Sequence, residues 1–154
     1  MTTTTTPLTH ASFTIERTYP VPVERVWAAH AELEQRLQWF GDDENFDLDA
    51  RSNDFRPGGI EIEDGRWHDG PRSKYVARYS DIVENERIVH TYDMWIDEAY
   101  LSTSLVTTTF EAVDGGTRLT YTEQGVYTDG PDGVASRETG CASILDKLGA
   151  YLTR

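Results

Sequence analysis

The segment PDGVASRETGCASILDKLGAYL, residues 131–152, decides the predicted fold. Cys141, Leu145, Leu148 and Leu152 recur along one stripe at helical spacing, which predicts one long amphipathic helix at the end of the chain. At about 1.5 Å per residue such a helix is on the order of 33 Å long, enough to cross a whole β-sheet. Its apolar stripe needs a partner, and the strands that precede it in the sequence are the expected one.

Before this helix, polar and apolar residues alternate with the period of two that β-strands show. The first strand is predicted over residues 13–20, and two short helices follow it, over residues 22–30 and 33–39. A Gly-Gly turn at Arg56–Gly59 then opens a run of strands, and Asp114–Gly116 predicts the hairpin before the last of them. The order indicates an α+β protein in which a curved antiparallel sheet of about seven strands grips the closing helix.

Two strands early in this run mix charged and apolar residues. In the first, Phe46, Leu48 and Ala50 are expected to share one face. In the next, Ile60 and Ile62 resume the alternation after the Gly-Gly turn.

The composition indicates one globular domain. The chain has 154 residues, 38% of them hydrophobic, and no apolar run approaches the roughly 20 residues that span a bilayer. The formal charge of −13 repels phosphate backbones and anionic lipids, so neither nucleic acid nor a membrane is an expected partner. Residues 1–10 are expected to be a disordered polar tail and residues 11–154 a single domain. The lack of a signal-peptide pattern and the single cysteine, Cys141, favour a cytoplasmic location.

Five short motifs occur in an order that is similar to a known superfamily. They are Pro22–Trp27, Gln38–Gly41, Arg56–Gly59, Asp81–Ile88 and Gly116–Thr120. With them the sequence resembles the START-like (SRPBCC) superfamily over nearly its whole length. Within it, the sequence looks most like the activator of heat-shock ATPase homologues, a group that also contains a calicheamicin-resistance protein. The resemblance implies a helix-grip fold with a deep apolar cavity between the sheet and the C-terminal helix. It also implies binding of a hydrophobic small molecule, and a minority of members are cyclases or hydrolases.

Several side chains are predicted to line this cavity because they fall on strand faces opposite the last helix, or on the helix itself. The predicted ligand-binding residues are Tyr75, Tyr79, His90, Tyr92, Met94, Phe110, Tyr121, Gly140, Cys141 and Ile144. Two interpretations of the strand that carries His90 stay open. Its polar side chains either orient a ligand in a cavity or belong to a packed core that contains a satisfied histidine.

His90 and Glu123 are the candidate catalytic residues, although neither belongs to a recognisable catalytic motif. A buried Glu123 near His90 would form an acid/base pair, which is the basis of the alternative function as a cyclase or hydrolase of polyketide-like substrates. In the other interpretation Glu123 lies at a strand end and is solvated. Because no catalytic signature accompanies them, binding is favoured over catalysis.

The remaining expectations concern partners. The sequence has no phosphate loop, no dinucleotide fingerprint and no metal-ligand spacing, so no cofactor and no metal are expected. A third possible function is a binding module for a chaperone or other protein, and the chain is expected to be a monomer or a homodimer. Segment 125–130 also has two interpretations: a lid over the cavity mouth, or an ordinary turn in which Tyr127 packs.

Overall fold

The computed structural model describes residues 7–41 and 43–154. Within these residues the elements follow the order that the sequence predicts. They are β1 (Thr9–Tyr19), α1 (Val23–Ala31), α2 (Leu33–Arg36), β2 (Phe46–Asn53), β3 (Ile60–Trp67), β4 (Arg72–Val83), β5 (Arg87–Ile96), β6 (Ala99–Val113), β7 (Gly116–Tyr127) and α3 (Gly130–Leu152).

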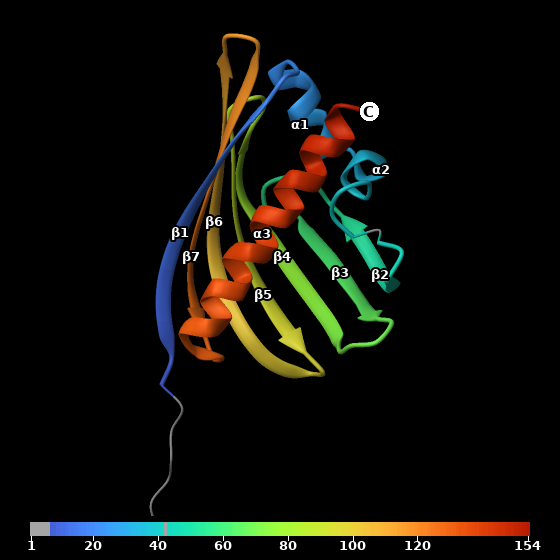
Figure 1. The fold of residues 1–154 in the computed structure, drawn as a ribbon, viewed down its shortest axis with the longest axis vertical. Helices are drawn as coiled ribbons and strands as arrows, with labels where there is room; N and C mark the ends of the chain where they lie inside the picture. The colour runs from blue at the N-terminus through green and yellow to red at the C-terminus, as the bar shows by residue number, and fades with distance from the viewer. Residues whose placement is uncertain (1–6, 42) are drawn as a thin grey trace, which may run out of the picture.

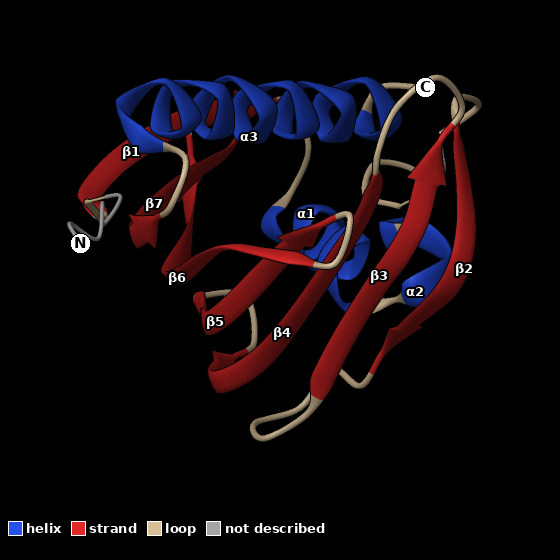
Figure 2. Ribbon diagram, turned by 90° about the horizontal axis from the view of Figure 1, so that it is seen from below, coloured by secondary structure: helices blue, strands red, loops and turns tan. Residues whose placement is uncertain are grey.

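The seven strands form one antiparallel sheet in the order β1-β7-β6-β5-β4-β3-β2. From β2 to β7, each strand pairs with the strand that follows it in the chain. β1 pairs with β7 instead of β2. α3 runs diagonally across the concave face of the sheet, and α1 and α2 lie near the C-terminal end of α3 (Figure 1). Viewed from below, the sheet curves into a trough that α3 closes (Figure 2). The predicted α+β helix-grip fold is confirmed.

Glycine is required at the two predicted turns. A Cβ on Gly59 would lie 1.9 Å from the carbonyl oxygen of Asp54, and one on Gly116 would lie 2.0 Å from that of Tyr19. Gly58 has a φ of +85°, in the left-handed region that favours glycine. The backbone therefore passes through both turns in a path that other residues would block.

The two short helices are fixed by the core beneath them. Val26 and Ala29 of α1 are fully buried, and the indole of Trp39 donates to the carbonyl oxygen of Ala29 at 3.0 Å. α2 ends at Arg36, three residues before the predicted end at Trp39. The chain continues through turns that bring Phe40 N–H to the carbonyl oxygen of Arg36 at 2.8 Å.

The predicted apolar stripe of α3 faces the sheet. Leu145, Leu148 and Leu152 are buried, and the hydroxyl of Tyr19 donates to the carbonyl oxygen of Leu145 at 2.8 Å. A Cβ on Gly149 would lie 3.1 Å from the Tyr19 ring, so the helix approaches β1 closely at that glycine. Burial of large apolar side chains stabilises the domain by roughly 1.5–3 kcal/mol for each one.

The two mixed strands do not bury their apolar residues in simple alternation. On β3, Glu61 is fully buried while Ile60 is 38% exposed. On β2 the register with β3 shifts between Leu48 and Ala50, and Ala50 is exposed. The expected shared face of Phe46, Leu48 and Ala50 is therefore wrong beyond Leu48, because the irregularity changes which side chains point inward.

The predicted tail and its boundary lie partly outside the described residues. Residues 1–6 of the tail are not described, and β1 already begins at Thr9, two residues before the expected start of the domain at residue 11. Among the described helices, none combines the length and the apolar character that crossing a bilayer demands.

Candidate ligand cavity

A cavity of about 90 Å³ lies between the sheet and α3. Its wall is mostly aromatic and aliphatic, and β4, β5, β6, β7, α3, the two short helices and the loops beside them contribute to it. The lining residues are His30, Arg36, Trp39, Phe40, Phe55, Tyr75, Tyr79, Ile88, His90, Tyr92, Thr108, Tyr121, Cys141, Ile144 and Leu145. The trough of the sheet is therefore not completely filled by α3.

Seven of the predicted wall residues line this cavity. They are Tyr75, Tyr79, His90, Tyr92, Tyr121, Cys141 and Ile144. The tyrosines form a packed aromatic row, with the rings of Tyr75 and Tyr92 4.9 Å apart and the ring of His90 about 6 Å from those of Tyr79 and Tyr92. The structure brings these residues together, and their role in binding a ligand stays a prediction.

The other three predicted wall residues lie elsewhere. Phe110 packs edge-on against Trp27 and His30, with ring centroids 5.1 Å and 5.0 Å away, because α1 covers that end of β6. Met94 packs against a separate small core cluster around Tyr92. Gly140 is exposed, since one residue turns a helix by about 100° and so carries Gly140 away from the inner face marked by Cys141.

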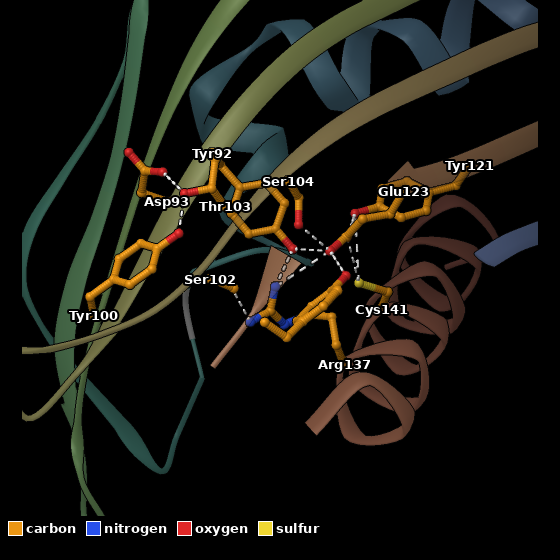
Figure 3. A network of polar contacts seen from close by, with 11 residues as sticks. Tyr92, Asp93, Tyr100, Ser102, Thr103, Ser104, Tyr121, Glu123, Arg137 and Cys141 are labelled. Atoms are coloured by element: carbon orange, nitrogen blue, oxygen red, sulfur yellow. Dashed lines mark hydrogen bonds and ion pairs between the residues drawn. The ribbon is translucent and has the colours of Figure 1, made fainter. Parts of the chain in front are cut away.

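Glu123 of β7 is fully buried at the centre of a polar network behind the cavity wall (Figure 3). Its two carboxylate oxygens accept from four hydroxyl groups and lie near an arginine and a thiol. The neighbours are Ser104 (2.7 Å), Tyr121 (2.7 Å), Tyr92 (2.8 Å), Tyr127 (2.9 Å), Arg137 (3.4 Å) and Cys141 (3.7 Å). Glu123 is thus buried and satisfied, and the interpretation as a solvated strand end is wrong.

The hydrogen bonds of this network keep Glu123 ionised. Burial raises its pKa, but the hydrogen bonds from Tyr121, Ser104 and Tyr92 and the charge of Arg137 lower it, and the pKa lies below its ordinary value. Burial also raises the pKa of Tyr92 and of Tyr121 well above the usual range, so both hydroxyls keep their protons and remain donors.

The proposed acid/base pair of His90 and Glu123 is not joined in the structure. No hydrogen bond between them is recorded among the described residues, and the oxygens of Glu123 accept from the protein's own donors. Glu123 also lies outside the lining of the cavity. The pairing stays a prediction without geometric support.

A second buried ion-pair network lies where α2 meets β2 and β3. The carboxylate of Glu61 accepts hydrogen bonds from three side chains here. The donors include Nη2 of Arg36 at 2.7 Å, Nη2 of Arg51 at 3.1 Å and the hydroxyl of Tyr75 at 3.3 Å. Burial raises the pKa of Glu61, but the charges and hydrogen bonds of the two arginines lower it to about 2. The positive charge of Arg36 at the cavity wall is therefore paired with a fixed carboxylate, which Arg51 shares.

Glu63 lies beside this network without a satisfied carboxylate. Its Oε2 and the Nε of Arg51 are both buried and have no hydrogen-bond partner among residues 7–41 and 43–154. Burial raises the pKa of Glu63 to about 7, and the charge of Arg51 lowers it only in part. Glu63 therefore changes charge near neutral pH, unlike Glu61.

The two histidines of the wall are electrically neutral. His30 Nδ1 lies 2.8 Å from the carbonyl oxygen of Val26. Burial and the nearby charge of Arg36 lower the pKa of His30 to about 3, and burial lowers that of His90 to about 4. The Nδ1 of His90 is buried and has no hydrogen-bond partner in the part of the chain that the structure describes. The cavity therefore presents two uncharged imidazoles on a mostly aromatic and aliphatic wall.

Sequence reasoning missed part of the wall and both buried ion-pair networks. The missed lining residues are His30, Arg36, Trp39, Phe40, Phe55, Ile88, Thr108 and Leu145. One feature of the sequence pointed to this region, because Arg36 comes shortly before two aromatic residues, Trp39 and Phe40. In the structure its guanidinium lies 4.9 Å and 4.7 Å from their ring centroids. The segment 125–130 is not a lid, because Tyr127 ends β7 and is fully buried against Glu123.

The fold and the cavity define a helix-grip protein of the START-like class. A family model described as "Activator of Hsp90 ATPase homolog 1-like protein" matches residues 20–153. The chain belongs to this family, as the motifs in the sequence suggested.

Solved structures of similar proteins extend over almost the same length. An uncharacterized protein from Rhizobium leguminosarum is 38% identical, with a TM-score of 0.90, and the match covers 96% of this chain and 97% of that one. The Mll3558 protein from Rhizobium loti is 39% identical, with a TM-score of 0.85, and the match covers 94% of this chain and 99% of that one. None of the proteins with curated descriptions matches the sequence.

A more distant structure shares the fold alone. It is DynU16, a protein in the dynemicin biosynthetic locus, at 19% identity and a TM-score of 0.67. The match covers 92% of this chain and 47% of that one. The same helix-grip architecture therefore occurs within a longer protein. At this identity the similarity carries no information about a shared ligand.

Proposed function

We propose that this protein binds a compact, uncharged, largely apolar small molecule in the cavity between the sheet and α3. The observation that carries the proposal is a cavity of about 90 Å³ whose wall is formed mainly by aromatic and aliphatic side chains. Ligand sites in proteins are typically concave, apolar and equipped with a few polar groups. The family is also known for ligand binding in a cavity of this kind, which supports the same function.

The charge of the wall supports an uncharged ligand. Arg36 is the single lysine or arginine among the lining residues, and it is held by Glu61 in a bidentate hydrogen-bonded pair. His30 and His90 carry no charge at neutral pH, because burial lowers both pKa values. A ligand ion would lose its hydration without gaining a counter-charge, which costs several kcal/mol.

The size of the cavity limits the ligand. An apolar cavity of roughly 150 Å³ is known to bind benzene, and drug-sized pockets have roughly 300–1,000 Å³. At about 90 Å³ this cavity accepts a single small ring after modest adjustment of its wall. A polycyclic ligand would require α3 to move away from the sheet.

A titration with one-ring compounds tests the proposal. Toluene is added to the ¹⁵N-labelled protein, and backbone and methyl shifts are followed by NMR. We expect saturable shifts confined to the residues around the cavity, including Ile144 and Leu145. The proposal would be overturned if toluene gave saturable shifts only at residues away from the cavity. It would also be overturned if neither toluene nor any other one-ring compound bound.

Two matched variants separate filling of the cavity from added bulk. Ile144→Trp places an indole at a position that lines the cavity, whereas Ser143→Trp adds the same group to the exposed side of α3. We expect Ile144→Trp to abolish toluene binding and Ser143→Trp to leave it unchanged. Equal binding by the two variants would show that toluene binds elsewhere.

A further inference from the structure

The hydrogen-bond donors on the tyrosines of the cavity wall are already used by the protein. Four tyrosine hydroxyls of the wall each donate to an internal acceptor. The pairs are Tyr75 to Glu61 (3.3 Å), Tyr79 to Asn53 (2.7 Å), Tyr92 to Glu123 (2.8 Å) and Tyr121 to Glu123 (2.7 Å). A tyrosine hydroxyl has one proton to donate, so these four groups have no donor left for a ligand.

The other strong donors of the wall are occupied in part. Arg36 donates from Nε and Nη2 to the two oxygens of Glu61, and the Trp39 indole donates to the carbonyl oxygen of Ala29 at 3.0 Å. The hydroxyl of Thr108, which can donate or accept, and the thiol of Cys141, which lies 3.7 Å from Glu123, are the remaining small polar groups of the lining. The tyrosine hydroxyls, the Trp39 indole and the two Arg36 nitrogens that face Glu61 therefore already donate within the protein.

His30 presents an acceptor. Its Nδ1 lies 2.8 Å from the carbonyl oxygen of Val26, and a carbonyl oxygen can only accept, so Nδ1 carries the proton. In a neutral imidazole with a protonated Nδ1, the Nε2 bears a lone pair. The geometry of α1 thus fixes the tautomer, and with it the role of the other nitrogen.

His90 adds a second imidazole without a protein partner on Nδ1. Its ring lies among the tyrosines of the wall, 6.1 Å from the Tyr79 ring and 6.0 Å from the Tyr92 ring. A neutral imidazole always has one nitrogen that accepts, whichever tautomer it adopts. The wall therefore combines tyrosine hydroxyls that already donate within the protein with one accepting nitrogen on each of two imidazoles, and His90 keeps one N–H as well.

We infer that the cavity selects uncharged ring compounds that carry an O–H or N–H donor, with the ring nitrogens of His30 and His90 as the accepting groups. This inference rests on the proposed function and adds the polar group by which the ligand is recognised. The aromatic wall holds the ring of the ligand, and the imidazoles discriminate between a ligand with a donor and an isostere without one. Burying a hydroxyl without a partner is costly, whereas burying it against a free acceptor is not.

Phenol and toluene form the decisive pair of probes, because they have similar size and differ in the donor. A purely apolar cavity favours toluene, which is the more hydrophobic of the two. We expect the full-length protein to bind phenol about tenfold more tightly than toluene, measured by NMR titration or calorimetry at pH 7. Toluene binding that equals or exceeds phenol binding would overturn the inference and leave the proposed function intact. Failure of both probes to bind would remove both.

Variants locate the acceptor. His30→Leu and His90→Leu remove ring nitrogens while keeping an apolar side chain of similar size. We expect at least one of them to bring phenol affinity down to that of toluene and to change toluene affinity less than about twofold. His68→Leu is the matched control, since His68 is exposed and hydrogen-bonds Asp47 outside the cavity. An unchanged preference for phenol in both cavity variants would contradict the assignment.

A spectroscopic measurement on the unmutated protein covers the case in which a variant does not fold. The side-chain ¹⁵N resonance of an unprotonated imidazole nitrogen shifts when that nitrogen accepts a hydrogen bond. We expect such a shift for His30 or His90 on addition of phenol and none on addition of toluene. Identical spectra with the two probes would overturn the inference.

Discussion

Arg137 of α3 donates from Nη1 to the hydroxyl of Tyr92 on β5 at 2.8 Å, and its guanidinium lies 5.6 Å from the centroid of the same ring. The same nitrogen lies 3.4 Å from the buried Oε2 of Glu123, and Nη2 donates to Ser102 at 2.7 Å. A single side chain thus fastens the first half of α3 to three strands. The Arg137 side chain is only 11% exposed, so these contacts are largely shielded from water.

Replacing this arginine is expected to destabilise the fold. Arg137→Met removes the positive charge beside Glu123 but keeps a flexible apolar stem, so the free energy of unfolding should fall by about 3 kcal/mol. Urea denaturation followed by circular dichroism measures the change. The double variant Arg137→Met/Glu123→Gln should lose less than the sum of the two single changes, because the buried charge is then absent. Strict additivity would contradict a direct interaction between the two side chains.

Gly140→Ala is expected to stabilise the protein. Gly140 lies in the middle of α3, is exposed, and has nothing within 4 Å of the position of an added Cβ. Replacing glycine by alanine at such a site gains about 0.5–1 kcal/mol in the free energy of unfolding. Gly149→Ala is the control, since its Cβ would come within 3.1 Å of Tyr19 and should give a smaller gain or a loss. Equal gains in the two variants would mean that helix propensity alone determines the change in stability and that the contact with Tyr19 has no effect.

The two glycines of the first turn should differ in their tolerance of alanine. At Gly58 an added Cβ has open space, and only its positive φ is unfavourable, so Gly58→Ala should cost about 1 kcal/mol. At Gly59 the Cβ would lie 1.9 Å from a backbone oxygen, and the turn must move or open. We expect Gly59→Ala to lower the melting temperature clearly more than Gly58→Ala. The reverse order would contradict the geometry of the turn.

Glu63 should make the stability of the protein depend on pH near neutrality. Burial raises its pKa to about 7 from 4.5, so between these two pH values the folded state holds a proton that the unfolded chain has released. The contribution of Glu63 is fully present below pH 4.5 and is lost as the pH rises through 7. Glu63→Gln removes this titration, and its melting temperature should therefore fall less than that of the unmutated protein between about pH 5 and 8.

The same measurement on Glu138→Gln controls for the loss of a carboxylate, because Glu138 is exposed on α3. Its melting curve should run parallel to that of the unmutated protein. The carboxylates of Glu61 and Glu123 have lowered pKa values, so their stabilisation is lost only in acid and does not obscure the range near pH 7. Parallel curves for Glu63→Gln and the unmutated protein would contradict the assignment.

The order of elements could be predicted from the sequence because it depends on local signals. The turn at Gly59, the hairpin at Gly116 and the stripe through Leu145 and Leu148 each reflect short-range geometry that any sheet and helix of this kind require. The tyrosines of β4, β5 and β7 were predictable for the same reason, since alternation places them on one face of the sheet.

The inner face of β3 could not be predicted in this way. Alternation separates Ile60 and Ile62 from Glu61 but does not say which set is buried. Glu61 is buried because Arg36 and Arg51, 25 and 10 residues away in the chain, supply its counter-charges. A preference that arises between distant segments leaves no trace in the local pattern.

The cavity wall was predicted only in part for a related reason. Phe110 lies on the predicted face of β6, yet α1 covers it and it belongs to the core. The position of α2, which brings Arg36 and Phe40 to the wall, follows from tertiary packing rather than from its own sequence. The strands could therefore be assigned to the wall, whereas the segments that close its ends could not.

The pairing of β1 with β7 affects how the protein is made. The register joins Thr9 to Tyr127 and Tyr19 to Thr117, so β1 pairs with a strand that is synthesised about a hundred residues later. Until β7 is synthesised, β1 has no partner strand in this sheet. A product that ends before β7 would therefore leave the backbone N–H and C=O groups of β1 unpaired, which favours aggregation.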